Sequence, residues 1–105
     1  ASWMYEGLMK MLGLWKGPLP LDTIKQYLSK GAILVDVRSQ EEYNQGHIDS
    51  AINIPLDVID NDERALNNEV ILYCKSGIRC LDAQKRLASN GNKKAHVLGA
   101  MSRWS

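Results

Sequence analysis

Residues 74–79, Cys-Lys-Ser-Gly-Ile-Arg, have the types and spacing needed for chemistry at a sulfur atom. They follow an apolar run and precede a stretch with helical spacing. A short loop containing Gly77 can direct several backbone N–H groups toward the sulfur of Cys74, and the start of a helix adds positive potential there. Lys75 and Arg79 add cationic charge nearby. Each of these effects favours the thiolate, so we predict that Cys74 is a nucleophile.

The charge around this loop is positive, although the net charge of the chain is only +1. Residues 36–69 include nine acidic residues and only two arginines. From residue 70 to the end there are seven basic residues and one acidic residue. This bias fits a small anionic substrate. No basic run interleaved with aromatic residues indicates nucleic-acid binding, and no apolar run is long enough for a membrane span.

The composition is that of one small globular domain, with 105 residues, 45 % hydrophobic and 24 % charged. Two cysteines do not make a disulfide framework. We expect Cys74 and Cys80 to be free thiols, since a cross-link would deform a short catalytic loop. The two histidines, His47 and His96, lack zinc-ligand spacing relative to the cysteines, so we expect no metal and no cofactor.

Two helices are predicted in the first third of the chain. Met4, Leu8 and Trp15 mark the apolar stripe of an amphipathic helix, which we assign to an N-terminal extension over residues 1–17 that covers the main domain, residues 18–105. A second helix begins near Leu21 and ends before Gly31, a typical helix C-terminal residue.

The rest of the chain alternates between short strands and short helices. Ser39 and Glu42 have capping-box spacing for a short helix, and residues 56–68 have a weak helical pattern. Residues 81–88 belong to the helix that follows the cysteine loop. This alternation predicts an α/β domain with a mainly parallel sheet. The predicted strands are 32–35, 51–54, 70–73 and 95–98.

Six ordered blocks of this chain resemble the signature blocks of single-domain rhodaneses. The resemblance runs from Leu19 to Trp104 and implies a rhodanese-like fold, with a mainly parallel central sheet flanked by short helices. Ala100 stands where the family often has a second glycine, and a closing helix is expected to be short or absent. The blocks are Asp36-Val37-Arg38, Glu42-Tyr43, Gly46-His47-Ile48, Ala51-Ile52-Asn53-Ile54-Pro55, Cys74-Lys75-Ser76-Gly77-Ile78-Arg79 and Leu98-Gly99-Ala100 with Trp104.

The resemblance implies a thiosulfate sulfurtransferase. Cys74 would take the outer sulfur of thiosulfate or a similar anionic donor as a persulfide, and a thiol or cyanide would then remove it. We expect a monomer or weak dimer. The compartment stays open between cytoplasm and periplasm, because a chain that begins with Ala1 is either a trimmed form or a mature exported one.

The backbone N–H groups of the loop are expected to surround the persulfide anion. Arg79 either binds the oxygens of the donor or ties the loop to its own backbone or to an acid, and both roles are compatible. Lys75 is either a mobile charge at the site or a solvated side chain, and Ser76 either donates to the sulfur or is merely exposed. The predicted binding residues are Lys75, Ser76, Gly77, Ile78, Arg79 and Cys80.

Two further positions, Asp36 and Arg38, are interpreted as supports. Asp36 is expected to hold a loop amide or a cation, and Arg38 to pair with Glu42. We interpret His47 as part of a turn and His96 as structural. Cys80 has two interpretations: a small helix-start residue, which we favour, or a resolving thiol that attacks the Cys74 persulfide.

Two other functions compete with the sulfurtransferase. A non-enzymatic persulfide or polysulfide carrier would need the same cysteine, so the sequence barely separates it. A phosphatase or arsenate reductase is less favoured, because those proteins use a C-x5-R loop that is wide enough for phosphate. Cys74 and Arg79 are one residue closer together, with C-x4-R spacing.

Overall fold

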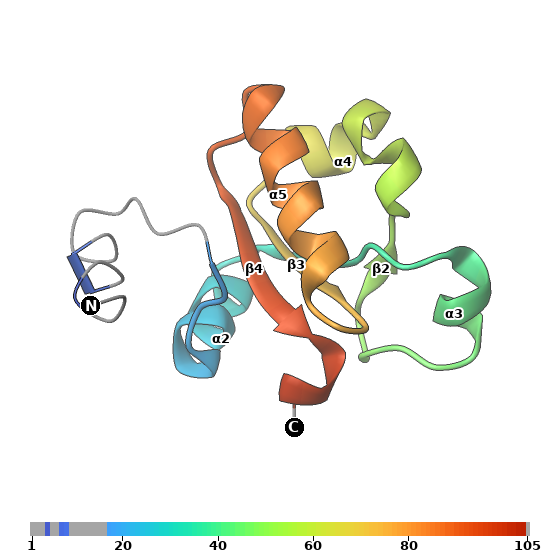
Figure 1. Cartoon of the computed structure of the whole chain (residues 1–105), viewed down its shortest axis with the longest axis horizontal. Coiled ribbons are helices and arrows are strands. Elements are labelled where there is room, and N and C mark those ends of the chain that lie inside the picture. The colour runs from blue at the N-terminus through green and yellow to red at the C-terminus, as the bar shows by residue number, and fades with distance from the viewer. Residues whose placement is uncertain (1–3, 5–6, 9–16, 105) are drawn as a thin grey trace.

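The computed structural model describes residue 4, residues 7–8 and residues 17–104 (Figure 1). The predicted helix over Met4 to Trp15 lies almost wholly outside the described residues. That helix and the domain boundary at residue 17 therefore stay predictions. None of the helices in the described ranges is long and apolar enough to cross a membrane.

A four-stranded, fully parallel sheet forms the centre of the molecule, in the order β2-β1-β3-β4. The predicted α/β fold with a parallel sheet is confirmed. All five residues of β3 are buried, as expected for an interior strand made only of apolar side chains. The strands are β1 (Ile33–Asp36), β2 (Ile52–Asn53), β3 (Val70–Cys74) and β4 (Ala95–Ala100).

Helices precede the first strand, connect successive strands and follow the last one. They are α2 (Leu21–Ser29), α3 (Gln40–Asn44), α4 (Glu63–Leu66) and α5 (Ile78–Ser89), with 3-10 helices η1 (Leu56–Asn61) and η2 (Met101–Arg103). The predicted capping box of α3 is present, and η2 confirms that the closing helix is short.

The helical pattern predicted over residues 56–68 is interrupted at Asp62. The backbone there is extended (φ −98°, ψ 115°), and the Asp62 carboxylate accepts a hydrogen bond from the N–H of Arg64. A side chain that caps a new helix in this way ends the preceding one. The segment therefore forms η1 and α4 rather than one helix.

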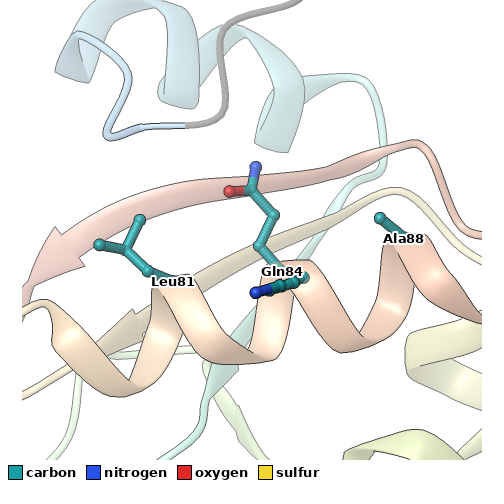
Figure 2. A pocket seen from close by; sticks show the side chains of 4 residues that line it. Leu81, Gln84 and Ala88 are labelled. Carbon is teal, nitrogen blue, oxygen red and sulfur yellow. The ribbon is translucent and has the colours of Figure 1, made fainter.

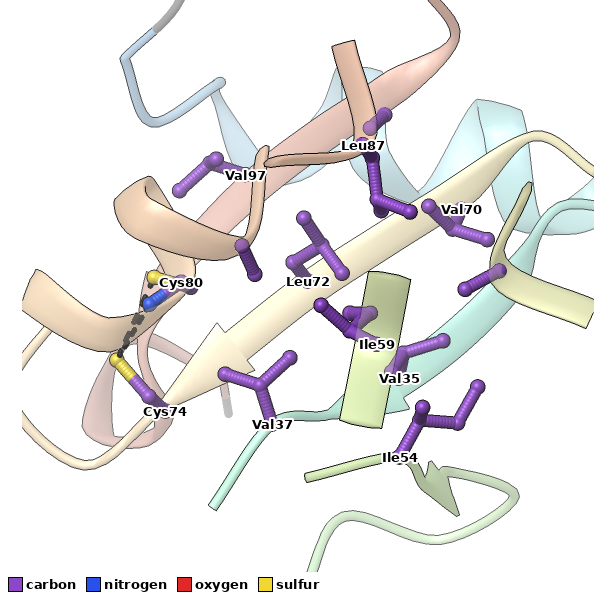
Figure 3. Close-up of a cluster of buried hydrophobic side chains, with 13 residues drawn as sticks. Val35, Val37, Ile54, Ile59, Val70, Leu72, Cys74, Cys80, Leu87 and Val97 are labelled. Atoms are coloured by element: carbon purple, nitrogen blue, oxygen red, sulfur yellow. Dashed lines mark hydrogen bonds between the residues drawn. The ribbon is translucent and has the colours of Figure 1, made fainter. Parts of the chain in front are cut away.

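The alternation of side chains along β3 decides which side of the sheet the cysteine faces. Val70, Leu72 and Cys74 belong to the cluster that packs under α5 and η1, which Figure 3 shows. Ile71 and Tyr73 point to the opposite face, where α2 and the C-terminal residues cover them. Cys74, at the end of β3, thus lies beside Cys80 in the first turn of α5 (Figure 3).

The predicted site lies at the carboxyl edge of the sheet. Asp36 is the last residue of β1 and Cys74 the last of β3, and these two strands are neighbours. Ala100 ends β4 and pairs with Cys74. Parallel strands place the residues that follow them at one common edge, which is where ligands bind in open α/β sheets.

Candidate functional site

The loop after β3 wraps around the sulfur of Cys74. Gly77 immediately precedes α5. Its φ of +97° is a backbone conformation that residues with a side chain rarely adopt. The Sγ atom of Cys74 accepts hydrogen bonds from the backbone N–H of Gly77 at 3.0 Å and of Cys80 at 3.4 Å. Two of the N–H groups expected to surround the sulfur thus point at it.

A second sulfur completes the surroundings of Cys74. The Sγ atoms of Cys74 and Cys80 lie 3.4 Å apart and interact through an S–H hydrogen bond, drawn as a dashed contact in Figure 3. Both cysteines are free thiols, as expected. The Sγ of Cys80 also lies 3.2 Å from the carbonyl oxygen of Gly77, a second acceptor for its proton.

These contacts lower the pKa of Cys74 and raise the pKa of Cys80. The hydrogen bond from the Cys80 thiol, helped by the backbone N–H groups of Cys80, Gly77 and Arg79, lowers the pKa of Cys74 to about 6 against the opposing effect of burial. The same hydrogen bond, burial and the neighbouring negative charge raise the pKa of Cys80 far above its usual range. The pair therefore holds one proton, on Cys80, at neutral pH.

The sulfur is covered by its own loop. Cys74 is fully buried, whereas Lys75 and Ser76 are exposed and Ile78 is 73 % exposed. Among the described residues, no hydrogen bond joins the Ser76 hydroxyl to the Cys74 sulfur. In this conformation no part of Cys74 is exposed to solvent.

Arg79 is tied to an acid, which was one of its two expected roles. Its guanidinium donates to both carboxylate oxygens of Glu42, at 2.7 and 2.9 Å, and this contact lowers the pKa of Glu42 to about 2. Glu42 also accepts from the N–H of Ser39 at the start of α3. The pair thus fastens the cysteine loop to α3, and the prediction that Arg38 pairs with Glu42 is wrong.

Arg38 instead pairs with Asp36 beneath the site. Its Nε and Nη2 atoms donate to the Asp36 carboxylate at 2.7 to 3.1 Å, and Nη2 also donates to the carbonyl of Gly46 at 2.7 Å. Both side chains are buried. Residues two apart on extended backbone lie on one side of the chain, which explains this local pairing. Asp36 thus holds a cation, as expected.

Two residues of this support were not foreseen from the sequence. The side-chain amide of Asn53 donates to the carbonyl oxygens of Asp36 at 3.0 Å and Arg38 at 2.9 Å. The hydroxyl of Tyr73 accepts from the N–H of Ile48 at 3.1 Å, and burial raises the pKa of this phenol. A polar residue in a short strand and a buried tyrosine were the available signals.

Both histidines make packing contacts, in agreement with the structural roles expected for them. The ring of His47 stacks on Tyr43 with centroids 3.7 Å apart. His96 stacks on Tyr27 and lies 2.9 Å from a carboxylate oxygen of Glu69.

Two surface cavities border α5. One, of about 340 Å³, lies along the helix and is almost wholly apolar; Figure 2 shows it, lined by Leu81, Gln84, Lys85 and Ala88. The other, of about 400 Å³, includes two arginines and Val37, a residue of the Cys74 cluster, so it suits an anion better than the first. Its lining residues are Val37, Ser39, Pro55, Leu56, Asp57, Arg79 and Arg86.

A parallel sheet with a cysteine at the end of a central strand, inside a loop of N–H donors, is typical of a rhodanese-like domain. The family model for that domain matches residues 21–105, so the chain belongs to the rhodanese-like family. Similar solved structures include a human single-domain sulfurtransferase, with TM-score 0.72 and 29 % identity over 84 % of this chain and 94 % of that one. A rhodanese with anions from E. coli has a TM-score of 0.64 and 29 % identity, and the match covers 71 % of this chain and 93 % of that one.

The curated relatives are longer proteins that are named as hydroxylases and not as sulfurtransferases. A tRNA uridine(34) hydroxylase of Buchnera aphidicola is 37 % identical over 78 residues, which is 67 % of this chain and 25 % of that protein. The hydroxylase of Escherichia coli is 30 % identical over 79 residues, which is 67 % of this chain and 23 % of that protein. The chain thus spans about a quarter of the length of these relatives.

Proposed function

We propose that this chain is a sulfurtransferase that carries a sulfane sulfur on Cys74. The sulfur comes from thiosulfate or a similar small anionic donor and passes to a thiol or to cyanide. One observation carries the proposal: the Sγ of Cys74 accepts N–H groups of Gly77 and Cys80 and has its pKa lowered to about 6. A thiolate present at neutral pH needs no general base.

The reaction has two steps. The Cys74 thiolate attacks the outer sulfur of thiosulfate; the S–S bond of the donor breaks, sulfite leaves with its electron pair, and a Cys74 persulfide anion remains. An acceptor such as cyanide then bonds to the outer sulfur, thiocyanate leaves, and the thiolate is restored. Charge balances in both steps, and the covalent intermediate predicts ping-pong kinetics.

The loop supports the persulfide through its main chain. Fixed N–H dipoles stabilise a developing anion without reorganising, which is the principle of an oxyanion hole. Lys75 to Cys80 are proposed as the residues that surround the donor, with Arg79 adding positive charge while it holds Glu42. Asp36 and Arg38 are proposed as supports beneath the loop.

The identity of the donor rests on the loop and not on the curated relatives. Their name refers to hydroxylation of tRNA, and this chain covers only about a quarter of their length. We therefore propose no tRNA partner. The carrier function remains the second candidate, because full burial of Cys74 favours slow exchange with small acceptors.

Intact mass with and without thiosulfate, together with thiocyanate formation from added cyanide, tests the proposal. We expect the wild type to gain one sulfur and to turn over, and Cys74→Ser to do neither. A mass gain without steady-state turnover would favour the carrier. A wild type that gains no sulfur, or a Cys74→Ser variant with unchanged turnover, would refute the role of Cys74.

A further inference from the structure

We propose that Cys80 is a resolving thiol, which attacks the loaded Cys74, releases the transferred sulfur as sulfide and leaves a Cys74–Cys80 disulfide. This inference rests on the proposed function, because it begins from the Cys74 persulfide. It adds a second outcome for that sulfur: besides transfer to an acceptor, the domain would reduce it.

The arrangement of the two sulfurs carries the inference. Their Sγ atoms are 3.4 Å apart before any reaction. A disulfide bond is about 2.05 Å long, so the atoms need to close by only about 1.4 Å. Cys80 is the third residue of α5, and its N–H also points at the sulfur of Cys74. The contact is therefore built into the start of the helix.

Burial gives Cys80 an advantage over soluble thiols. Both cysteines are fully buried, and they are the only two cysteines of the chain. A thiol from solution must first gain access to a fully buried sulfur, whereas Cys80 is already in contact with it. Holding two reacting groups in contact replaces a bimolecular step by a unimolecular one.

The step balances in atoms and electrons. The sulfur of Cys80 bonds to the Sγ of Cys74, and the bond from that Sγ to the outer sulfur breaks. The outer sulfur leaves with the electron pair and takes the proton of Cys80, as hydrosulfide. The two cysteine sulfurs are oxidised to a disulfide while the outer sulfur is reduced, and an external dithiol then restores both thiols.

Loading also changes the state of Cys80 in the required direction. In the sulfur-free protein the Cys80 proton is held by the Cys74 thiolate, which keeps Cys80 protonated and unreactive. After loading, the negative charge lies on the outer sulfur and the Sγ of Cys74 becomes the electrophile. The Cys74 thiolate then no longer accepts the Cys80 proton, which can pass to the outer sulfur, and the 3.4 Å contact joins the attacking and the electrophilic sulfur.

The test uses a single turnover without any external thiol. Reduced wild type, Cys80→Ser and Cys80→Ala are loaded with thiosulfate under argon, desalted, and followed by intact mass and by a sulfide assay. The two variants keep the backbone N–H and differ little in volume from cysteine, and circular dichroism checks their fold. Wild type without donor, kept under the same conditions, controls for air oxidation.

We expect the wild-type persulfide to decay with release of one sulfide per chain, leaving a protein two hydrogens lighter than the reduced form. Both variants should gain one sulfur and keep it, with sulfide release slower by at least about tenfold. Equal decay in wild type and variants, or disulfide in the donor-free control at the same rate, would overturn the inference alone. Absence of persulfide from the wild type and both variants, with no sulfide released and no disulfide formed, would overturn the proposed function and this inference together.

Discussion

Removal of the Cys80 thiol is expected to raise the pKa of Cys74. The hydrogen bond from Cys80 is the largest cause of the low value of about 6, ahead of the N–H groups of the loop. A hydrogen bond to a charged group contributes about 1.5–3 kcal/mol, and a thiol is a weak donor, so the lower end applies. Since one pKa unit is about 1.4 kcal/mol, Cys80→Ala should raise the pKa of Cys74 to about 7.

The thiolate fraction follows from these two values. At pH 7 about 90 % of Cys74 is ionised in the wild type and about half in Cys80→Ala. As pH falls through 6 both proteins lose thiolate, and at pH 5 the variant retains about a tenth of the wild-type amount. Above pH 9 both are fully ionised. The thiolate of the variant is the more basic one and therefore the more nucleophilic, by about threefold.

Two measurements check this prediction. The ultraviolet absorbance of the thiolate, taken as the difference from Cys74→Ser at each pH, gives the titration directly and does not require access to the buried sulfur. The rate of sulfur uptake should then be about threefold lower in Cys80→Ala at pH 5 and about threefold higher above pH 9. Identical titration midpoints for wild type and variant, or a wild-type midpoint near 9, would refute the claim that the Cys80 thiol stabilises the Cys74 thiolate.

Two further predictions concern the support of the loop. Gly77→Ala should lose about 1–2 kcal/mol of unfolding free energy and take up sulfur more slowly, because φ +97° is strained for alanine and the N–H bonded to Cys74 must shift; urea unfolding and uptake rates measure this. Asp36→Asn should cost about 3–5 kcal/mol by urea unfolding, because it leaves a buried guanidinium without a counter-charge, whereas Asp62→Asn breaks a pair of the same spacing at an exposed arginine and should cost less than about 1 kcal/mol. Equal costs for these two variants would contradict the role of burial.

The parts of this fold that could be predicted from sequence are those set by local pattern. The apolar run of β3 predicts a buried strand, and the spacing of Ser39 and Glu42 predicts a capping box, because each depends only on neighbouring residues. A glycine in the loop allows either a close backbone approach or a positive φ, and Gly77 has the positive φ. These local features suffice to place a cysteine in an N–H-lined loop.

Pairings between distant residues could not be predicted in the same way. Glu42 accepts Arg79, 37 positions away, while the nearer Arg38 turns to Asp36. Sequence spacing brings both arginines within reach of an acid, and only the packing of α3 against the cysteine loop decides between them. The contacts of Asn53 with two backbone carbonyls are also long-range, and a polar residue in a short strand signals that it has partners without saying which.

The contact between the two sulfurs combines both kinds of information. The left-handed Gly77 starts α5 so that its third residue directs its N–H back at Cys74, and any residue at position 80 would lie there. The backbone therefore determines the proximity, whereas the side chain determines the chemistry: a serine could only donate a hydrogen bond, while a cysteine can also form a bond to sulfur. Cys80 is thus the residue through which this loop differs from one that only stores and transfers a sulfur atom.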